Sequence, residues 1–270
     1  MAKFGAPTAS RLLATAFALA ALVTGAALRA QDLEELEGQL KRAHLGKPLT
    51  LRNFYQGDEI RFSAGGQAIN RPASGPWTLY AMLEVASIRL QPGELEIESK
   101  RLLQVYEPGL KAFRAVRAAE TVRITLELPL GGTDEKRLRT TMKKVFLGEG
   151  EKLADIAPLY WKRFLTNDES QYAREVYQVK DVDSPPRLLE HAEPEYNQFA
   201  RRQQLKGSVV ILAVVNGQGR VENPQISEPL GMGLDDAAVQ ALSRWKFEPA
   251  RHNGKPVAVR ATIEVAFRPL

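Results

Sequence analysis

Apolar and polar side chains alternate with a period of two in several stretches of the chain, which is typical of β-strands that bury one face. The clearest stretch runs from Val257 to Phe267, where every second side chain is apolar and the polar side chains of Arg260, Thr262 and Glu264 stand between them. A second clear stretch runs from Val122 to Leu128. Such alternation predicts antiparallel sheets that have one face on a core and the other in water.

The region from Pro48 to Leu130 carries most of the other strand signals, which are separated by turn dipeptides such as Pro92-Gly93. Its apolar phase slips between Val85 and Ile88, so we predict a β-bulge near Ala86-Ser87. The pattern predicts that this region forms an antiparallel meander or a partly closed barrel.

Helical periodicity flanks these strands. The predicted helices cover residues 32–45, residues 133–146 with Thr133 as N-cap, and residues 151–164. We therefore predict a β-rich domain with flanking helices over residues 31–165. Residues 166–183 are largely polar and are predicted to be a connector, and the stretch from Tyr177 to Leu189 is predicted to be a lead-in strand or an extended arm, because its two prolines disfavour helix.

Residues 184–270 combine strand and helix signals. The segment from Ser208 to Val215 is apolar on both faces, which predicts a central strand. The turn Asn216-Gly217-Gln218-Gly219 predicts a hairpin into a second strand over residues 220–227, because Asn and Gly accept positive φ cheaply. Two helices are predicted, over residues 194–204 and 234–245.

Several short motifs occur in this region in a characteristic order. They are Pro-Glu-Tyr, Leu-Lys-Gly-Ser-Val, Gly-Arg-Val, Leu-Asp-Asp-Ala-Ala, Trp-Lys-Phe-Glu-Pro-Ala and Asn-Gly-Lys-Pro-Val. Together they resemble TonB C-terminal domains, from about residue 184 to the end of the chain. The resemblance implies an α+β fold with a three-stranded antiparallel sheet and two helices on one face. It implies that these residues define the fold: Tyr196, Gly207, Gly219, Trp245, Phe247 and Pro249.

The resemblance also implies that the last strand is an exposed edge, which binds the Ton-box peptide of outer-membrane TonB-dependent transporters. An edge strand leaves a row of N–H and C=O groups unpaired, and an extended peptide can satisfy them. A second copy of the chain could use the same edge, which would give a homodimer. The predicted partner-binding residues are Val257, Val259, Arg260, Ala261, Thr262, Ile263, Glu264, Val265 and Phe267.

Residues 1–30 have the composition of a targeting segment. Lys3 and Arg11 precede an uncharged stretch from Leu12 to Leu28, and the small Ala30 follows at a plausible cleavage position. The segment is predicted to be either a signal peptide or an uncleaved inner-membrane anchor. Both interpretations place the remaining chain in the periplasm of a Gram-negative-type cell.

Two features of a complete TonB energy transducer are missing. The apolar stretch carries no histidine, since the first histidine of the chain is His44, and the 16 prolines are scattered instead of forming a linker. Two hypotheses follow for this TonB-like chain. It either transduces energy for transport across the membrane, engaging inner-membrane motor proteins, or it is a secreted periplasmic adaptor that binds proteins without energy coupling.

Composition narrows the remaining possibilities. The chain has no cysteine, which excludes disulfides and thiolate chemistry. Three of its 37 basic residues lie in the first 30 positions, and the other 34 barely exceed the 32 acidic residues, so a nucleic-acid partner is not predicted. Its histidines, His44, His191 and His252, have no metal-ligand spacing, and Asp235-Asp236 is interpreted as a helix start. No catalytic residue, cofactor or metal is predicted, and an enzyme in the N-terminal region is only a third hypothesis.

Overall fold

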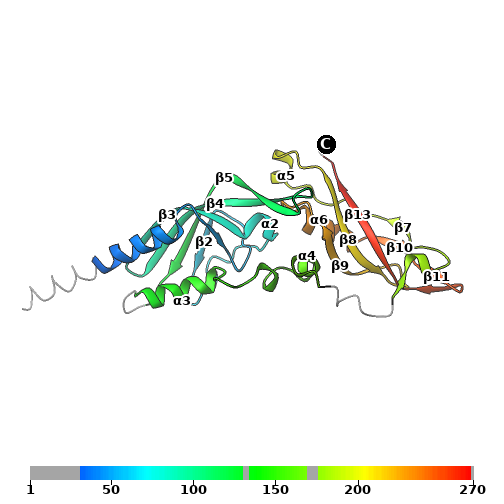
Figure 1. Ribbon diagram of the computed structural model, residues 1–270, viewed down its shortest axis with the longest axis horizontal. Coiled ribbons are helices and arrows are strands. Elements are labelled where there is room, and N and C mark those ends of the chain that lie inside the picture. Colours follow the sequence, from blue (N-terminus) through cyan, green and yellow to red (C-terminus); the bar gives the residue numbers. More distant parts are fainter. Residues whose placement is uncertain (1–30, 130–133, 169–175, 269–270) are drawn as a thin grey trace, which may run out of the picture.

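The computed structural model describes residues 31–129, 134–168 and 176–268. The molecule is elongated, with one large sheet toward each end (Figure 1). The predicted signal peptide or membrane anchor lies outside the described residues. Among the helices that the structure does describe, none is both long and apolar enough to cross a membrane.

The first sheet has five strands in the order β1-β3-β4-β5-β2. These strands are β1 (Pro48–Thr50), β2 (Glu59–Phe62), β3 (Met82–Gln91), β4 (Glu94–Glu107) and β5 (Ala112–Glu127). Strands β3, β4 and β5 form the predicted antiparallel meander, but β2 pairs in parallel with β5. The predicted bulge is confirmed, because the pairing of β3 with β4 shifts register between Val85 and Ser87.

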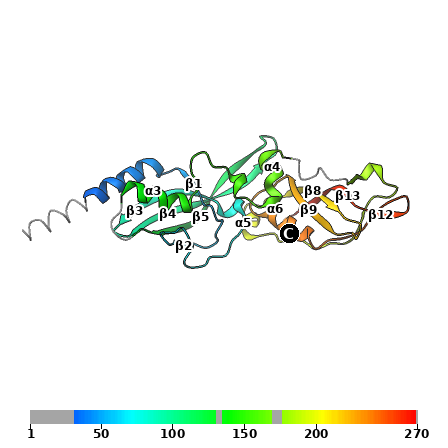
Figure 2. The same cartoon turned by 90° about the horizontal axis from the view of Figure 1, so that it is seen from below.

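Two helices lie side by side across one face of this sheet (Figure 2). One covers residues 31–44, and the other is α3 (Glu135–Val145). Leu40 and Leu138 from these helices pack with the buried side chains of the sheet. The N-cap of α3 is Asp134, whose side chain accepts a hydrogen bond from the Arg137 amide, and the predicted cap Thr133 lies outside the described residues.

The predicted helix over residues 151–164 is wrong as a single element. The structure has two 3₁₀ turns, η1 (Leu153–Asp155) and η2 (Leu159–Trp161), and a short helix, α4 (Lys162–Thr166). Pro158 explains the interruption, because proline disfavours helical geometry in the residue before it and lacks an N–H donor.

The second sheet has four strands in the order β6-β13-β8-β9, so the predicted three-stranded sheet is corrected. These strands are β6 (Tyr177–Gln178), β8 (Gly207–Val215), β9 (Val221–Glu228) and β13 (Val259–Phe267). Strand β8 is central, as its two apolar faces predicted. The additional strand, β6, comes from the predicted connector and pairs in parallel with β13.

Helix α6 (Leu234–Leu242) packs its buried side chains against one face of this sheet. The other predicted helix is shorter than expected, since α5 spans only Gln198–Arg202. The side chain of Asn197 accepts hydrogen bonds from the amides of Phe199 and Ala200, which fixes the helix start at that residue.

Short elements complete the C-terminal region. They are η4 (Val179–Asp181), the pair β7 (Arg187–Glu190) with β10 (Lys246–Glu248), the pair β11 (Ala250–His252) with β12 (Lys255–Val257), and, earlier in the chain, α2 (Trp77–Tyr80). The hairpin of β11 and β12 turns at Asn253-Gly254, where both residues have positive φ.

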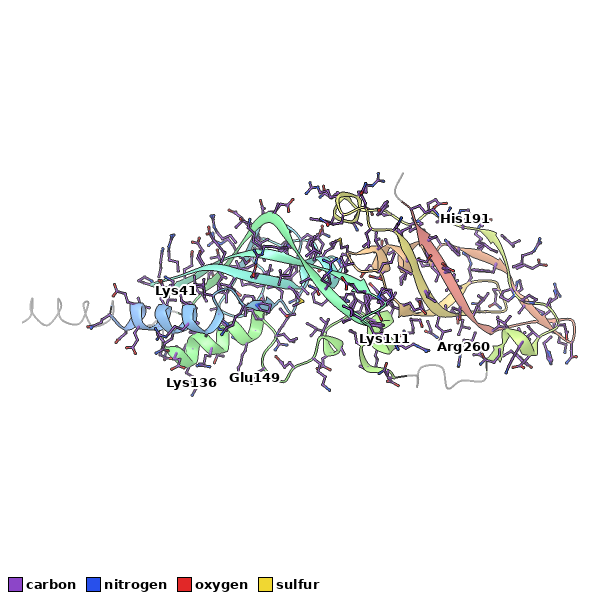
Figure 3. The ribbon with its side chains drawn as sticks, turned by 45° about the horizontal axis from the view of Figure 1, so that its top comes forward. Lys41, Lys111, Lys136, Glu149, His191 and Arg260 are labelled. Carbon is purple, nitrogen blue, oxygen red and sulfur yellow. The ribbon has the colours of Figure 1, made fainter. Side chains whose placement is uncertain are left out.

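The two large sheets are joined by a shared core. The hairpin of β4 and β5 reaches toward α6, and Lys111 in Figure 3 marks its tip. The Met232 amide donates to the Gln104 carbonyl at 2.7 Å, and the Tyr106 amide donates to the Leu230 carbonyl at 2.9 Å. One continuous apolar cluster contains residues of both predicted domains. The division at residues 166–183 stays a prediction, and substantial packing crosses it.

Candidate functional site on strand β13

Strand β13 is fully paired on one side. It runs antiparallel to β8 from the pair Val259–Val215 to the pair Phe267–Gly207 without a register shift. On its other side, the described residues pair with it only through β6, at Val259 and Arg260. The part of β13 after Arg260 therefore presents an outer edge to which no described strand is paired.

One hydrogen bond shows which backbone groups face this edge. The Tyr177 amide of β6 donates to the Ala258 carbonyl at 3.3 Å, so the even-numbered residues direct their backbone groups outward. Both polar groups of one strand residue point to the same side, and the direction repeats every second residue. The open edge consequently consists of the N–H and C=O groups of Thr262, Glu264 and Ala266.

The side chains of β13 alternate as the sequence predicted. The odd-numbered side chains are buried in the core shared with β8 and α6: Val259, Ala261, Ile263, Val265 and Phe267. Those of Thr262, Glu264 and Ala266 are exposed, and that of Arg260 is partly exposed. The odd-numbered side chains therefore hold the strand in place, while the even-numbered backbone groups remain for a partner.

One predicted edge residue lies elsewhere. Val257 belongs to β12, where it pairs with Ala250 of β11, and is not part of β13. The pairing between β11 and β12 ends there, and β13 begins two residues later at Val259. The sequence pattern runs through this junction without a break, so periodicity alone extends the strand too far.

The sequence predicts a lead-in strand or extended arm from Tyr177 to Leu189, and the structure has strand β6 at its start, but the pairing of β6 with β13 was not predicted. This strand has two residues, which are too few to produce a periodic signal. In Figure 3, Arg260 marks the end of β13 at which β6 pairs.

The predicted fold-defining residues lie around the sheet. The Tyr196 hydroxyl donates to the Leu205 carbonyl at 2.7 Å, and the Trp245 indole N–H donates to the Ala192 carbonyl at 3.0 Å. Both rings pack against the core, Trp245 buried and Tyr196 partly buried. Pro249 is partly buried between β10 and β11.

The two predicted glycines fit tight positions. Gly219 has a φ of +74°, and the Phe247 amide donates to its carbonyl at 2.9 Å. Gly207 has a φ of +146°, and a Cβ there would lie 2.8 Å from a Leu230 methyl group. Phe247 is itself partly buried against the core. These contacts explain why these positions take glycine.

Two buried carboxylates lie where α6 meets the N-terminal half. Asp235 accepts hydrogen bonds from the Leu230 and Gly231 amides, at 2.7 and 2.8 Å. Asp236 accepts one from the Tyr160 hydroxyl at 2.6 Å. Burial raises the pKa of Asp235 to about 7 and that of Asp236 to about 6. The two aspartates thus hold the loop before α6 and the turn η2, which agrees with a structural interpretation.

Candidate enzymatic features do not converge in the described part of the chain. No three His, Cys, Asp or Glu side chains there are grouped closely enough to hold a metal ion. A groove of about 800 Å³ lies between the helix over residues 31–44 and α3. At its rim, Arg139 pairs with Glu135 at 2.7 Å and Arg52 pairs with Glu151.

Comparison with known proteins points to the C-terminal region. Residues 192–269 match the family model described as Gram-negative bacterial TonB protein C-terminal. Protein TonB of Vibrio cholerae is 32% identical over 88 residues, which make up 32% of this chain and 36% of that protein. Protein TonB of Pseudomonas aeruginosa is 33% identical over 87 residues, 32% of this chain and 25% of that protein.

A solution NMR structure of the Pseudomonas aeruginosa TonB CTD is 28% identical, covers 35% of this chain and 95% of that chain, and has a TM-score of 0.28. The matches span between a quarter and about a third of the length of the curated relatives. The family model and the curated relatives name the same family that the motifs of the C-terminal region resemble. Residues 192–269 of this chain therefore form a TonB C-terminal domain.

Proposed function

We propose that the chain is a periplasmic TonB-like protein whose strand β13 binds an extended segment of an outer-membrane transporter by strand addition. The observation that carries this proposal is the open edge of β13, at Thr262, Glu264 and Ala266, within a TonB C-terminal domain. An extended peptide satisfies such groups with main-chain hydrogen bonds. Binding of this kind places modest demands on the sequence of the partner and needs no catalytic group.

The edge of strand β3, which other parts of the chain cover, supports the proposal by contrast. Beyond its short pairing with β1, strand β3 has no described strand beside it on that side. The helix over residues 31–44 and the residues that follow it cover this edge instead. The Glu37 carboxylate accepts a hydrogen bond from the Leu90 amide at 2.7 Å, and the Gly46 amide donates to the Val85 carbonyl at 2.9 Å. Proteins normally protect edges in this way. The contrast with β13 favours a binding role for the edge that is left open.

The exposed face of β13 favours a particular chemistry in the proposed partner. Glu264 lies between Arg260 and Arg268 on this face, so the charges alternate along the strand. Cross-strand pairs of opposite charge stabilise a sheet, whereas like charges destabilise it. The preferred partner segment therefore places a basic or neutral residue opposite Glu264. On the other face it places apolar residues, next to Ile263 and Val265.

The proposal extends to energy coupling as a second step. Residues 1–30 hold the candidate anchor, through which inner-membrane motor proteins would act on the C-terminal domain that binds the peptide. A secreted adaptor would use the same edge without this step. The mature N-terminus, determined by sequencing the protein from the periplasm and from the membrane fraction, distinguishes the two. A mature protein that begins at Gln31 contradicts energy coupling and leaves the proposed peptide binding unaffected.

Peptide binding is tested with a synthetic Ton-box peptide, using calorimetric titration and amide chemical shifts. We expect the largest shifts at the amides of Thr262, Glu264 and Ala266. The variant Glu264→Pro removes one outward N–H, which β8 does not use, because proline is accepted where the N–H faces solvent. We expect this variant to bind about tenfold more weakly, as the loss of about 1.4 kcal/mol from one hydrogen bond implies.

Glu264→Ala is the matched control, because it removes the side chain and keeps the N–H. Its affinity should stay within about threefold of the wild type. Circular dichroism of both variants checks that the sheet is intact. Equal binding by a folded Glu264→Pro variant would contradict strand addition at this edge. Sedimentation of the free protein shows whether a second copy occupies the edge instead.

A further inference from the structure

Strand β6 occupies the first part of the edge that the partner is proposed to use. It pairs Tyr177 with Val259 and Gln178 with Arg260, in parallel with β13. By the register of this pair, the Arg260 amide faces the Tyr177 carbonyl. A peptide added to β13 would lie in the same line as β6. The two segments cannot both pair with Ala258 and Arg260.

Contacts on both sides hold this segment in place. The ring of Tyr177 packs on the ring of His252 with their centroids 4.8 Å apart. Farther along, the Asp183 amide donates to the Arg251 carbonyl at 2.8 Å, and the Arg251 amide donates to the Ser184 carbonyl at 3.0 Å. Val182 packs against the core of the C-terminal domain. The segment is thereby fastened to β11 as well as to β13.

The chain leaves the edge directly after β6. Val179 begins the 3₁₀ turn η4, and its side chain is 39% exposed. Tyr177 is 42% exposed, so two apolar side chains border the point where the open edge begins. The edge that remains for a partner runs from Ala261 to Phe267, which is about 20 Å at about 3.3 Å per residue.

We propose that β6 is a stop, built into the chain, that closes the first part of the β13 edge and sets the register of the bound segment. The partner pairs only along Ala261–Phe267, and one end of its extended segment lies against Val179. The partner that fits is a short extended peptide with an apolar residue at that end. This inference rests on the proposed peptide binding and adds the length and register of the segment.

Amide hydrogen exchange, followed residue by residue with NMR on the full chain, tests the stop. Tyr177→Pro removes both the N–H that bonds to the Ala258 carbonyl and the ring that packs on His252, so the pairing of β6 with β13 is weakened although the carbonyl opposite the Arg260 amide remains. In the free protein we expect the Arg260 amide to be protected in the wild type. We expect it to exchange at least about tenfold faster in Tyr177→Pro. Gln178→Ala is the control, because the backbone groups of Gln178 face away from β13 and its exchange pattern should match the wild type.

The same measurement is then made with an eleven-residue synthetic Ton-box peptide. In the wild type it should protect Thr262, Glu264 and Ala266 and leave Arg260 unchanged. In Tyr177→Pro it should protect Arg260 as well, which shows that the edge has lengthened. Fast exchange of Arg260 in the free wild type, or new protection of Arg260 by the peptide in the wild type, would overturn the stop.

The outcomes separate this inference from the proposed function. If the peptide binds neither protein, the proposed function fails. The comparison of Arg260 exchange in the free proteins still decides whether β6 closes the edge. If the peptide binds both proteins with the same protected residues, peptide binding stands and the stop is wrong.

Discussion

Gly219 occupies a position that allows no side chain. A Cβ added there would lie 1.8 Å from the Phe247 carbonyl oxygen, and the residue has a φ of +74°. The clash is with backbone, so it cannot be relieved by rotating a side chain. The hairpin of β8 and β9 and the start of β10 therefore meet at a point that only glycine satisfies.

We predict that Gly219→Ala lowers the free energy of unfolding by about 2–4 kcal/mol, measured by urea denaturation. Gly254→Ala is the control for backbone strain alone, because its φ is +72° and no atom lies within 4 Å of an added Cβ. That variant should lose about 1 kcal/mol. Equal losses in the two variants would show that the contact with Phe247 is unimportant.

Asp236 gives the stability of the domain a pH dependence. Burial raises the pKa of this carboxyl from 3.8 to about 6 in the folded chain, and that of Asp235 to about 7. A raised folded pKa contributes stability that is fully present below the unfolded value and is lost as pH rises through the folded value. The two carboxyls therefore favour the folded state at pH 5 over pH 8.

We predict that Asp236→Asn weakens this dependence, while the Tyr160 hydroxyl can still donate to the amide oxygen. Urea denaturation at pH 5, 6, 7 and 8 measures the difference between variant and wild type. Burial lowers the pKa of His44, which acts in the opposite direction, but this contribution cancels in the difference. A difference that stays constant across this range would show that Asp236 does not titrate with folding.

At the scale of elements, the helix over residues 31–44 protects the edge of β3. Glu37 contributes the hydrogen bond to the Leu90 amide, and this bond is the main reason why its pKa is lowered. We predict that Glu37→Ala costs about 1–2 kcal/mol and accelerates exchange of the Leu90 amide. Glu34→Ala, an exposed position of the same helix, should change neither. Unchanged Leu90 exchange in Glu37→Ala would contradict the protective role.

The sequence predicts elements well where a period of two is sustained. Strands β8 and β13, the hairpin between β8 and β9, and the bulge in β3 were all expected from the pattern, and the structure confirms them. Pairings that depend on distant contacts were not predicted. The sequence predicts an extended segment from Tyr177, but its pairing as β6 depends on the edge that β13 offers about 80 residues later, which two residues do not encode.

In the candidate site, too, the sequence predicts what local periodicity determines and does not predict what distant contacts determine. The alternation from Val259 to Phe267 predicted which side chains are buried. It did not predict that the chain itself covers the edge at Arg260, nor that Val257 belongs to another strand. Both depend on where remote segments lie, which periodicity does not encode.

At the scale of the whole molecule, an aromatic cluster of the N-terminal half lies in the core that both halves share. Trp161 is fully buried, and its ring centroid lies 5.1 Å from that of Trp77 and 6.2 Å from that of Phe113. Nearby, the Gly233 amide donates to the Thr78 hydroxyl at 2.8 Å. The sequence pattern gives such residues only as apolar positions. It does not show that they share one core with side chains of the C-terminal half.

We predict that Trp161→Ala costs about 3–5 kcal/mol and uncouples the halves. Calorimetry of the wild type should give one cooperative transition, and that of the variant should give two. Leu159→Ala, at a side chain that is 75% exposed, should keep the single transition and change the stability by less than about 0.5 kcal/mol. Two transitions already present in the wild type would contradict the coupling.

The shared core also limits how the C-terminal domain can be exchanged during evolution. A domain on a free tether can be recombined with many unrelated neighbours, because its surface is complete without them. Here the loop before α6 is completed by backbone groups of β4, through the bonds from Met232 to Gln104 and from Tyr106 to Leu230. The C-terminal domain is therefore incomplete without its neighbour, and we expect the two halves to be inherited as one unit.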